Sequence, residues 1–339
     1  MPPKGTPGGD QITEIARRLV RENPDHAARG LARMLVAESN GALTIDQARN
    51  RIMRQLGVHG NADRKVVKAA ASREPRQAGV NYTLPPSIAR PWTRYRLEVT
   101  GRVGILSDVH VPYHSEIAVR AAVDHLVEIG IEALVLNGDI ADFYAISRYT
   151  KDPRQRDFSG ELEAVRDFVG WIRETFPKIP IVYKAGNHEE RWQHYIWQHA
   201  PELSKERRMS LQAWLNLDNH GIDLVEDQRP IMAGRLPILH GHELPKGMSS
   251  PVNPARGAYM RMKHTGLVGH HHRTSGHAEA DFDHRETFNW STGCLCDLTP
   301  EYARINSWNW GFAVATIHAD GEFDVENLRI TADGKVRSS

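Results

Sequence analysis

The sequence predicts an α/β protein that carries a small all-helical appendage at its N-terminus. Three times between residues 100 and 190, a short apolar run leads into a polar cluster, and a helical pattern follows. Residues 10–60 instead show only apolar residues at helical spacing. Open α/β sheets bind ligands beyond the carboxyl ends of their strands, so we expect the functional site at the polar clusters.

The composition is that of an ordinary soluble globular protein, with 339 residues of which 40% are hydrophobic and 25% charged. No apolar run approaches the roughly 18 residues of a membrane span, and the N-terminus lacks an apolar signal core. We therefore expect a cytoplasmic protein without a membrane partner. Cys294 and Cys296 are too close for an unstrained disulfide and are expected to be reduced. The oligomeric state stays open.

Charge is unevenly distributed along the chain, although the net charge is only +1. Residues 1–100 contain 17 Lys and Arg against 9 Asp and Glu, whereas residues 101–339 contain 26 against 33. The basic N-terminal part is therefore expected to contact something anionic, such as nucleic acid. The acidic remainder suits a cation site.

The N-terminal part divides into three predicted segments. Residues 1–9 are rich in Pro and Gly and are predicted to be disordered. Residues 10–60 contain three helical patterns and predict a small bundle with 8 basic and 6 acidic residues. A DNA-binding helix-turn-helix type module and an interaction or dimerisation bundle both fit this pattern. Residues 61–93 predict a basic linker or strap.

Residues 94–331 are expected to form the α/β domain, and residues 332–339 a frayed tail. Strands over 95–100 and 102–106 are expected to be neighbours, and a helical stretch is expected over 189–217. Helices are also expected over 116–129 and 160–176, and strands over 133–136, 181–183, 236–239, 266–268 and near 288–294, 311–318 and 322–329.

Five polar clusters follow these strands and offer carboxylate, imidazole and amide ligands. They are Asp108-Val109-His110, Gly138-Asp139-Ile140-Ala141-Asp142, Gly186-Asn187-His188-Glu189, His240-Gly241-His242 and Gly269-His270-His271-His272. Such N and O donors suit Zn, Mn or Fe without any cysteine. Asp139 is placed to bridge two metals with its carboxylate. Two divalent ions about 3.5 to 4 Å apart can clamp a phosphate on both flanks.

The clusters, in this order, resemble the calcineurin-like metallophosphoesterase superfamily. Its pattern runs Asp-x-His, Gly-Asp-x-x-Asp, Gly-Asn-His-Asp/Glu, His and Gly-His-x-His, and the resemblance covers about residues 100–320. It implies a two-sheet sandwich flanked by helices that holds two divalent metal ions. It further implies that one ion binds Asp108, His110, Asp139 and His272, and the other Asp139, Asn187, His240 and His270. Mn²⁺ is the expected metal, with Fe, Zn or Ni as alternatives.

The resemblance also implies that His188 is a phosphate-facing acid oriented by Asp142. The predicted mechanism is in-line attack of a metal-bridging hydroxide on phosphorus, with His188 protonating or hydrogen-bonding the leaving oxygen. His242 is a rival metal ligand. Arg191 and Arg273 lie beside motif residues and could hold a phosphate oxygen, but the alternative that each is a surface arginine stays open.

The substrate prediction rests on the second cluster. Protein Ser/Thr phosphatases of this superfamily continue it as Gly-Asp-x-Val-Asp-Arg-Gly, whereas here Phe143-Tyr144 follows Asp142. The pattern is more similar to the bacterial and phage branch, which contains nucleases and phosphodiesterases. We therefore expect a phosphodiesterase acting on nucleic acid or nucleotides. A protein or small-molecule phosphomonoesterase, and a DNA- or protein-binding module with a secondary catalytic domain, are the alternatives.

Overall fold

The computed structural model describes residues 7–24, 26–56, 85–149, 152, 154, 157–245 and 252–339. The chain divides into two compact units, Met1–Ala89 and Arg90–Ser339. The predicted disorder of residues 1–6 and the predicted linker over residues 61–84 lie outside the described residues. The predicted disordered segment, residues 1–9, extends too far, because the first helix begins at Gly9.

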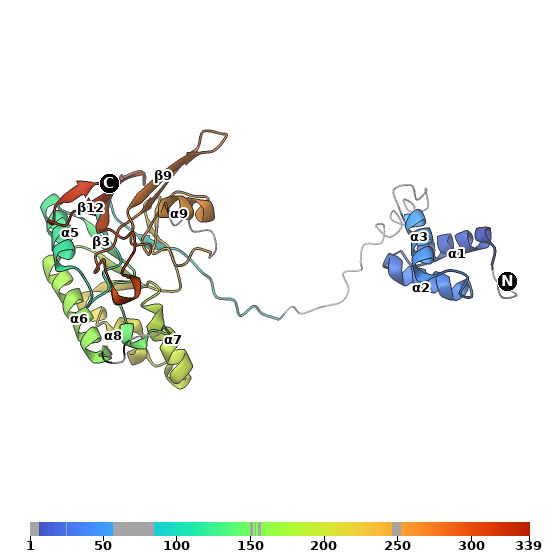
Figure 1. Cartoon of the computed structure of the whole chain (residues 1–339), viewed down its shortest axis with the longest axis horizontal. Helices are drawn as coiled ribbons and strands as arrows, with labels where there is room; N and C mark the ends of the chain where they lie inside the picture. Colours follow the sequence, from blue (N-terminus) through green and yellow to red (C-terminus); the bar gives the residue numbers. More distant parts are fainter. Residues whose placement is uncertain are drawn as a thin grey trace. The chain divides into compact units, whose positions relative to one another are not determined.

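The first unit is a three-helix bundle of α1 (Gly9–Glu22), α2 (Ala28–Glu38) and α3 (Ile45–Leu56) (Figure 1). Its core consists of the apolar residues at helical spacing, among them Leu19, Leu35 and Ile52. Thr44 and Gln47 form a reciprocal capping box at the start of α3, since each side chain accepts a hydrogen bond from the other residue's backbone N–H. The predicted helical appendage is present.

The second unit contains two mixed sheets. The seven-stranded sheet has the order β13-β12-β11-β2-β3-β4-β5, and the six-stranded sheet has the order β1-β6-β7-β8-β10-β9. Their bounds are β1 (Tyr95–Leu97), β2 (Gly101–Leu106), β3 (Ala133–Asn137), β4 (Ile181–Lys184), β5 (Ile222–Val225), β6 (Ile231–Ala233), β7 (Leu236–Leu239), β8 (Gly266–Val268), β9 (Ser275–Ala280), β10 (Glu286–Ser291), β11 (Gly311–Ile317), β12 (Phe323–Ile330) and β13 (Val336–Ser338).

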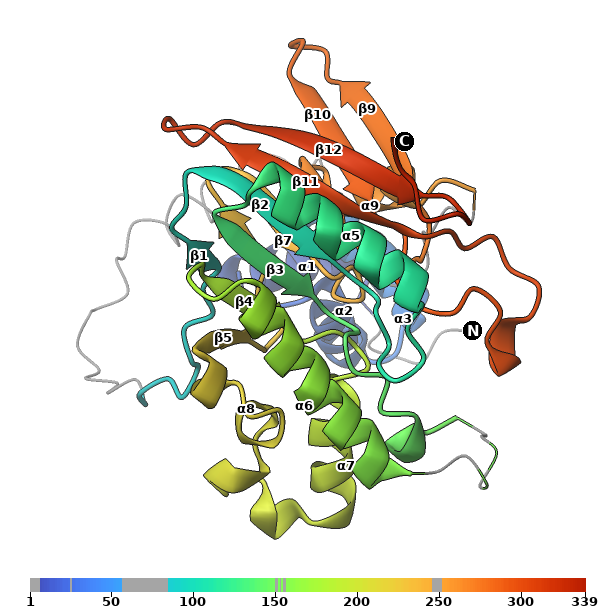
Figure 2. The ribbon, with the colours of Figure 1, turned by 90° about the vertical axis from the view of Figure 1, so that its left-hand side faces the viewer.

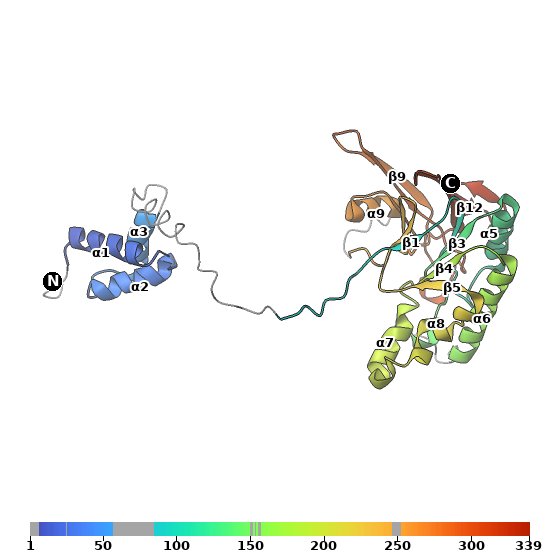
Figure 3. The ribbon, with the colours of Figure 1, turned by 180° about the vertical axis from the view of Figure 1, so that it is seen from behind.

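The two sheets pack face to face with helices outside them. Along β3, Ala133 and Val135 belong to the core between the sheets, whereas Leu134 and Leu136 belong to the core under the helices. Helices α5 (Glu116–Ile129) and α6 (Phe158–Thr175) cover the outer face of the seven-stranded sheet (Figure 2). Helix α9 (Pro254–Met262) packs on β7 and β8 of the other sheet, on the side away from α5 and α6 (Figure 3). The predicted two-sheet sandwich flanked by helices is confirmed.

Shorter helical segments fill the loops. They are α7 (Glu190–His199), α8 (Leu211–Trp214), and the 3₁₀ turns Tyr144–Ile146, Pro201–Leu203, Arg207–Met209, Asp218–His220 and Glu301–Ala303. The prediction of one helical stretch over 189–217 is wrong, because α7 ends before Pro201, whose ring cannot continue a helix. None of the helices in the described ranges is long and apolar enough to cross a membrane.

Two strand predictions are also corrected. The segments around β1 and β2 are not neighbours, because β2 already pairs with β3 on one edge and β11 on the other, and β1 pairs with β6. The tail is not frayed, because β13 pairs antiparallel with β12 over Leu328–Ile330. Strand pairing depends on segments far apart in sequence, which local patterns do not specify.

Candidate metal centre

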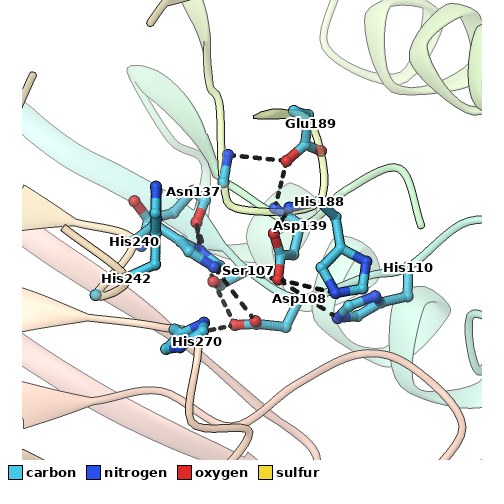
Figure 4. Close-up of polar contacts among 12 residues, drawn as sticks. Ser107, Asp108, His110, Asn137, Asp139, His188, Glu189, His240, His242 and His270 are labelled. Carbon is cyan, nitrogen blue, oxygen red and sulfur yellow. Dashed lines mark hydrogen bonds and ion pairs between the residues drawn. The ribbon is translucent and has the colours of Figure 1, made fainter. Parts of the chain in front are cut away.

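The polar clusters converge where the carboxyl ends of parallel strands from both sheets meet. Strands β2, β3 and β4 run parallel in one sheet, and β7 and β8 run parallel in the other. Figure 4 shows Asp108 and Asp139 surrounded by the rings of His110, His188, His240 and His270. The structure thus brings together side chains that lie up to 164 positions apart, from Asp108 to His272.

Asp139 lies at the middle of this cluster and is buried. Its Oδ2 lies 3.2 Å from His240 Nε2, 3.9 Å from His110 Nε2 and 3.8 Å from His188 Nε2. Its Oδ1 accepts a hydrogen bond from the backbone N–H of His188 at 2.9 Å. Asp139 belongs to two potential metal-holding groups, one with Asp108 and His110, the other with His240 and His270.

The rings of His240 and His110 are oriented by hydrogen bonds from their Nδ1 atoms, which point away from the centre of the cluster. His240 Nδ1 donates to the Asn137 carbonyl at 2.8 Å, and His110 Nδ1 donates to Asp142 Oδ1 at 2.7 Å. Both Nε2 atoms therefore face inward, where each ring in its neutral form offers a lone pair to a metal. His110 Nε2 lies 3.2 Å from His272 Nε2, and two such lone pairs repel unless a proton or a cation lies between them.

Several buried polar atoms of the cluster have no hydrogen-bond partner within the described part of the chain. They are Asp108 Oδ1, Asn187 Oδ1, His240 Nε2 and His270 Nδ1. Buried polar atoms are normally hydrogen-bonded, so these four ligand atoms, two of which have only another ligand atom 3.2 Å away, indicate a missing partner. These atoms are the carboxylate, amide and imidazole donors that a divalent transition metal accepts.

The electrostatics lead to the same conclusion. Burial by itself raises the pKa of Asp139, but the neighbouring imidazoles of His188 and His240 hold that pKa well below its usual range. Burial conversely lowers the pKa of His240, but Asp139 and Asp108 outweigh it and raise this pKa to about 10. The buried carboxylates thus require positive charge beside them, which divalent cations supply. The residues present fit a metal centre.

His188 lies at the edge of the cluster and contacts Asp142. Its Nδ1 donates to the Asp142 carbonyl oxygen at 2.8 Å and lies 3.1 Å from Asp142 Oδ1. Arg191 is beside both residues, donating from Nη2 to His188 Nε2 and from Nη1 to the Asp142 carbonyl, each at 2.8 Å. Arg273, in contrast, donates from Nη1 to Ser307 Oγ at 3.4 Å.

The rival ligand His242 has other partners. Its Nε2 lies 3.0 Å from Glu190 Oε1, and its Nδ1 lies 3.6 Å from Glu243 Oε2. Among the described residues, no potential metal-holding group includes His242. Its ring lies beside those of His240 and His270, with centroids 5.3 and 6.3 Å away.

The backbone of the centre is strained. Five of its residues have left-handed φ angles between 50° and 67°, namely Asp108, His110, Asp139, His270 and His272. This conformation is uncommon for residues with a side chain, and it persists only where the surrounding structure enforces it. A Cβ at Gly186 would lie 2.3 Å from Asp139 Oδ1, and one at Gly269 only 2.0 Å from Ser107 Oγ, so both positions require glycine.

Two supporting carboxylates were not recognised from the sequence. Glu189, 1% exposed, accepts hydrogen bonds from the backbone N–H groups of Asp139, Ile140, Ala141 and Gly186 and from the Tyr183 hydroxyl, at 2.8 to 2.9 Å. Its place directly after Gly186-Asn187-His188 was a usable signal.

The second is Glu243, which accepts hydrogen bonds from the backbone N–H groups of His240 and Gly241. Its partner is Lys184, whose Nζ lies 2.8 Å from Glu243 Oε1 although the lysine is 0% exposed. A lysine at the end of the apolar run Ile181-Val182-Tyr183 hinted at a buried cation.

This fold and site define a metal-dependent hydrolase that acts on phosphate esters. The calcineurin-like phosphoesterase family matches residues 101–290, which is more than half of the chain. The chain therefore belongs to the calcineurin-like phosphoesterase family, whose members use dinuclear metal centres.

Three similar proteins each share a quarter or less of their aligned residues with this chain. The chain is 25% identical over 254 residues to the Gene 54 protein of Mycobacterium phage D29, covering 69% of this chain and 98% of that protein. A dimetal phosphatase from Danio rerio is similar at 13% identity and a TM-score of 0.36, over 67% of this chain and 96% of that one. A purple acid phosphatase from yellow lupin (Lupinus luteus) seeds is similar at 14% identity and a TM-score of 0.39, over 71% of this chain and 53% of that one.

Proposed function

We propose that this protein is a phosphodiesterase that acts on nucleic acid or nucleotides. The observation that carries the proposal is that two pockets adjoin the centre and have no lining residue in common. One, of about 860 Å³, is lined by Asn187 and His270, and the other, of about 420 Å³, by His110 and Asp142. A phosphodiester carries a substituent on each side of phosphorus, whereas a monoester needs room for only one.

We assign the metal ligands by the shared position of Asp139. One ion would be held by Asp108, His110, Asp139 and His272, and the other by Asp139, Asn187, His240 and His270. Mn²⁺ is the proposed metal, with Fe, Zn or Ni as alternatives that the same donors accept. When bound, the two ions lower the pKa of water and neutralise charge on the phosphoryl oxygens.

The protein's own residues orient the substrate and handle a proton. Asp142 accepts the hydrogen bond from His188 Nδ1, so the ring presents Nε2 toward the centre, where the doubly protonated imidazolium can donate to the leaving oxygen. Arg191 contacts this Nε2 in the structure and can turn its guanidinium to a phosphate oxygen when substrate enters. Arg273 is a weaker candidate for phosphate binding, because its guanidinium contacts Ser307.

The test compares initial rates on bis-p-nitrophenyl phosphate and p-nitrophenyl phosphate with Mn²⁺-loaded protein, using His188→Ala as the control. Diester hydrolysis that is lost in the variant would support the proposal. Hydrolysis of the monoester alone would replace it by a phosphomonoesterase. No turnover with any divalent metal would make a binding role of the N-terminal unit the leading hypothesis.

A nucleic-acid contact of the first unit is a second candidate function. Four arginines, Arg29 and Arg33 of α2 and Arg49 and Arg54 of α3, are exposed on the bundle. Exposed arginines can bind a phosphate backbone. Replacing Arg49 and Arg54 by alanine should weaken oligonucleotide binding and lower its salt dependence. Unchanged affinity at low salt would dismiss this role.

A further inference from the structure

The larger pocket beside the centre is rich in cationic and imidazole side chains. Its walls come from the loop after Tyr144–Ile146, from α7, from the loop after β7 and from α9. Its inner end is formed by Asn187 and His270, two of the proposed ligands of one metal. A group bound in this pocket would therefore lie next to a phosphate bound at the centre.

Three arginines from separate segments line this pocket: Arg148, Arg191 and Arg261. Among its described lining residues, Glu190 is the only carboxylate. That carboxylate is already engaged, because Oε1 lies 3.0 Å from His242 Nε2 and accepts from Gln228 Nε2 at 3.2 Å. The arginines therefore give the pocket an excess of positive charge, and this charge attracts anionic groups.

Arg261 of α9 gives an independent sign of a missing ligand. Its Nε is buried and has no hydrogen-bond partner within the described ranges. A buried guanidinium N–H without an acceptor is unfavourable, and the planar guanidinium matches phosphate oxygens in two-point hydrogen bonds. Phosphate is thus the ligand chemistry that this side of the pocket fits.

The smaller pocket has the opposite character. It is lined by four carboxylates, two arginines and three tyrosines, namely Asp142, Asp152, Asp297 and Glu301, Arg154 and Arg304, and Tyr113, Tyr144 and Tyr302. One of the arginines, Arg154, is bound to Asp152 with Nη2 2.6 Å from Oδ2. An additional phosphate would be repelled here, whereas an uncharged ring can contact the tyrosines.

We propose that the arginine-lined pocket binds the phosphate next to the scissile one in a polynucleotide strand, so that the strand continues on the Asn187 and His270 side. The smaller pocket then receives the base-bearing end of the substrate. This inference rests on the proposed phosphodiesterase function and adds a substrate class to it: a nucleic-acid strand with at least two consecutive phosphates, rather than an isolated diester.

The experiment compares Arg261→Gln, Arg148→Gln and the unmodified full chain, all loaded with Mn²⁺. We would measure kcat/KM for a short single-stranded oligonucleotide and for bis-p-nitrophenyl phosphate, which has no second phosphate. Each variant should lower the ratio of the two values by about 5- to 10-fold, in line with loss of one charge-assisted phosphate contact. The exposed Arg120 of α5 lies outside the pocket, so Arg120→Gln should leave the ratio unchanged.

Binding provides the second measurement. Affinity of the Mn²⁺-loaded full chain for a fluorescent oligonucleotide would be followed against salt, with His188→Ala added to every protein to slow hydrolysis. Each pocket variant should reduce the slope of log affinity against log salt by about 1 relative to Arg120→Gln. Arg148 is exposed, so its variant should fold even where the one at Arg261 does not.

The two proposals can fail separately. Ratios and salt slopes equal to those of the unmodified chain, in a protein that hydrolyses bis-p-nitrophenyl phosphate, would overturn the pocket assignment alone. Absence of diester hydrolysis in the unmodified chain would overturn the proposed function.

Discussion

The two sheets supply different halves of the centre and support them differently. The seven-stranded sheet delivers the carboxylates Asp108 and Asp139, and the six-stranded sheet delivers only imidazoles among the proposed metal ligands. Behind the first half, Glu189 is held by N–H groups and a hydroxyl. Behind the second half, Glu243 is paired with the buried cation of Lys184. The comparison teaches that the first carboxylate is held by five hydrogen bonds from uncharged donors, whereas the second accepts two backbone hydrogen bonds and is paired with a buried lysine.

The halves are also connected to one another. Lys184 belongs to β4 of the seven-stranded sheet, while Glu243 follows β7 of the other sheet. The backbone N–H of His270 donates to Asp108 Oδ2 at 2.9 Å. Because these contacts connect the two halves, a substitution in either half is expected to alter the geometry of the other half as well.

The largest effect is expected for Asp139→Asn, which removes the carboxylate common to both metal-holding groups. We expect both metals to be lost and turnover to fall by more than the 10- to 100-fold typical of an outer partner, roughly 1,000-fold or more. Metal content by mass spectrometry checks this, with Asp167→Asn on the exposed face of α6 as the matched control. Two metals at full occupancy in the variant would contradict the bridging role of Asp139.

The next effect is expected for Lys184→Met, which removes the buried cation paired with Glu243 in the imidazole half. Because Glu243 would stay buried without its cation, the free energy of unfolding should fall by about 3 to 5 kcal/mol. Urea unfolding measures this, and the double variant Lys184→Met with Glu243→Gln should recover part of the loss. A single variant as stable as the unmodified chain would show that the ion pair does not support this half.

His188→Ala tests a residue of the carboxylate half that we place outside the metal ligands. We expect metal content to stay intact while turnover falls by about 100-fold or more, because the donor to the leaving oxygen is lost. Metal analysis and initial rates on the same preparation separate the two quantities. Unchanged turnover would remove His188 from the mechanism, and loss of metal would make it a ligand.

The smallest effect is expected for Glu189→Gln. The amide keeps the shape, but its NH₂ group would meet N–H donors where a carboxylate oxygen now accepts, so we expect about 1 to 3 kcal/mol of lost stability. Urea unfolding beside Glu163→Gln, an exposed position of α6, provides the measurement. If Glu189→Gln lowered the free energy of unfolding more than Lys184→Met does, the expected order of the two halves would be reversed.

Much of the fold was predictable because its signals are local. The helix predicted over 116–129 has those bounds in the structure, since apolar spacing and the Ser115 cap define it within one segment. The pairing of β1 was not predictable, because it depends on which strand edges stay free in the assembled sandwich. The break after α7 was missed although Pro201 marks it.

The sequence by itself determined the family and the candidate ligands, because a metal centre needs particular residue types directly after strands, and that order is visible along the chain. Only the tertiary structure decided which residues hold those ligands in place. Lys184 and Glu243 lie 59 positions apart, and Glu189 bonds to backbone groups 48 to 50 positions away. Such contacts exist only once two sheets have packed, since backbone N–H groups and buried charges leave no periodic pattern in the sequence.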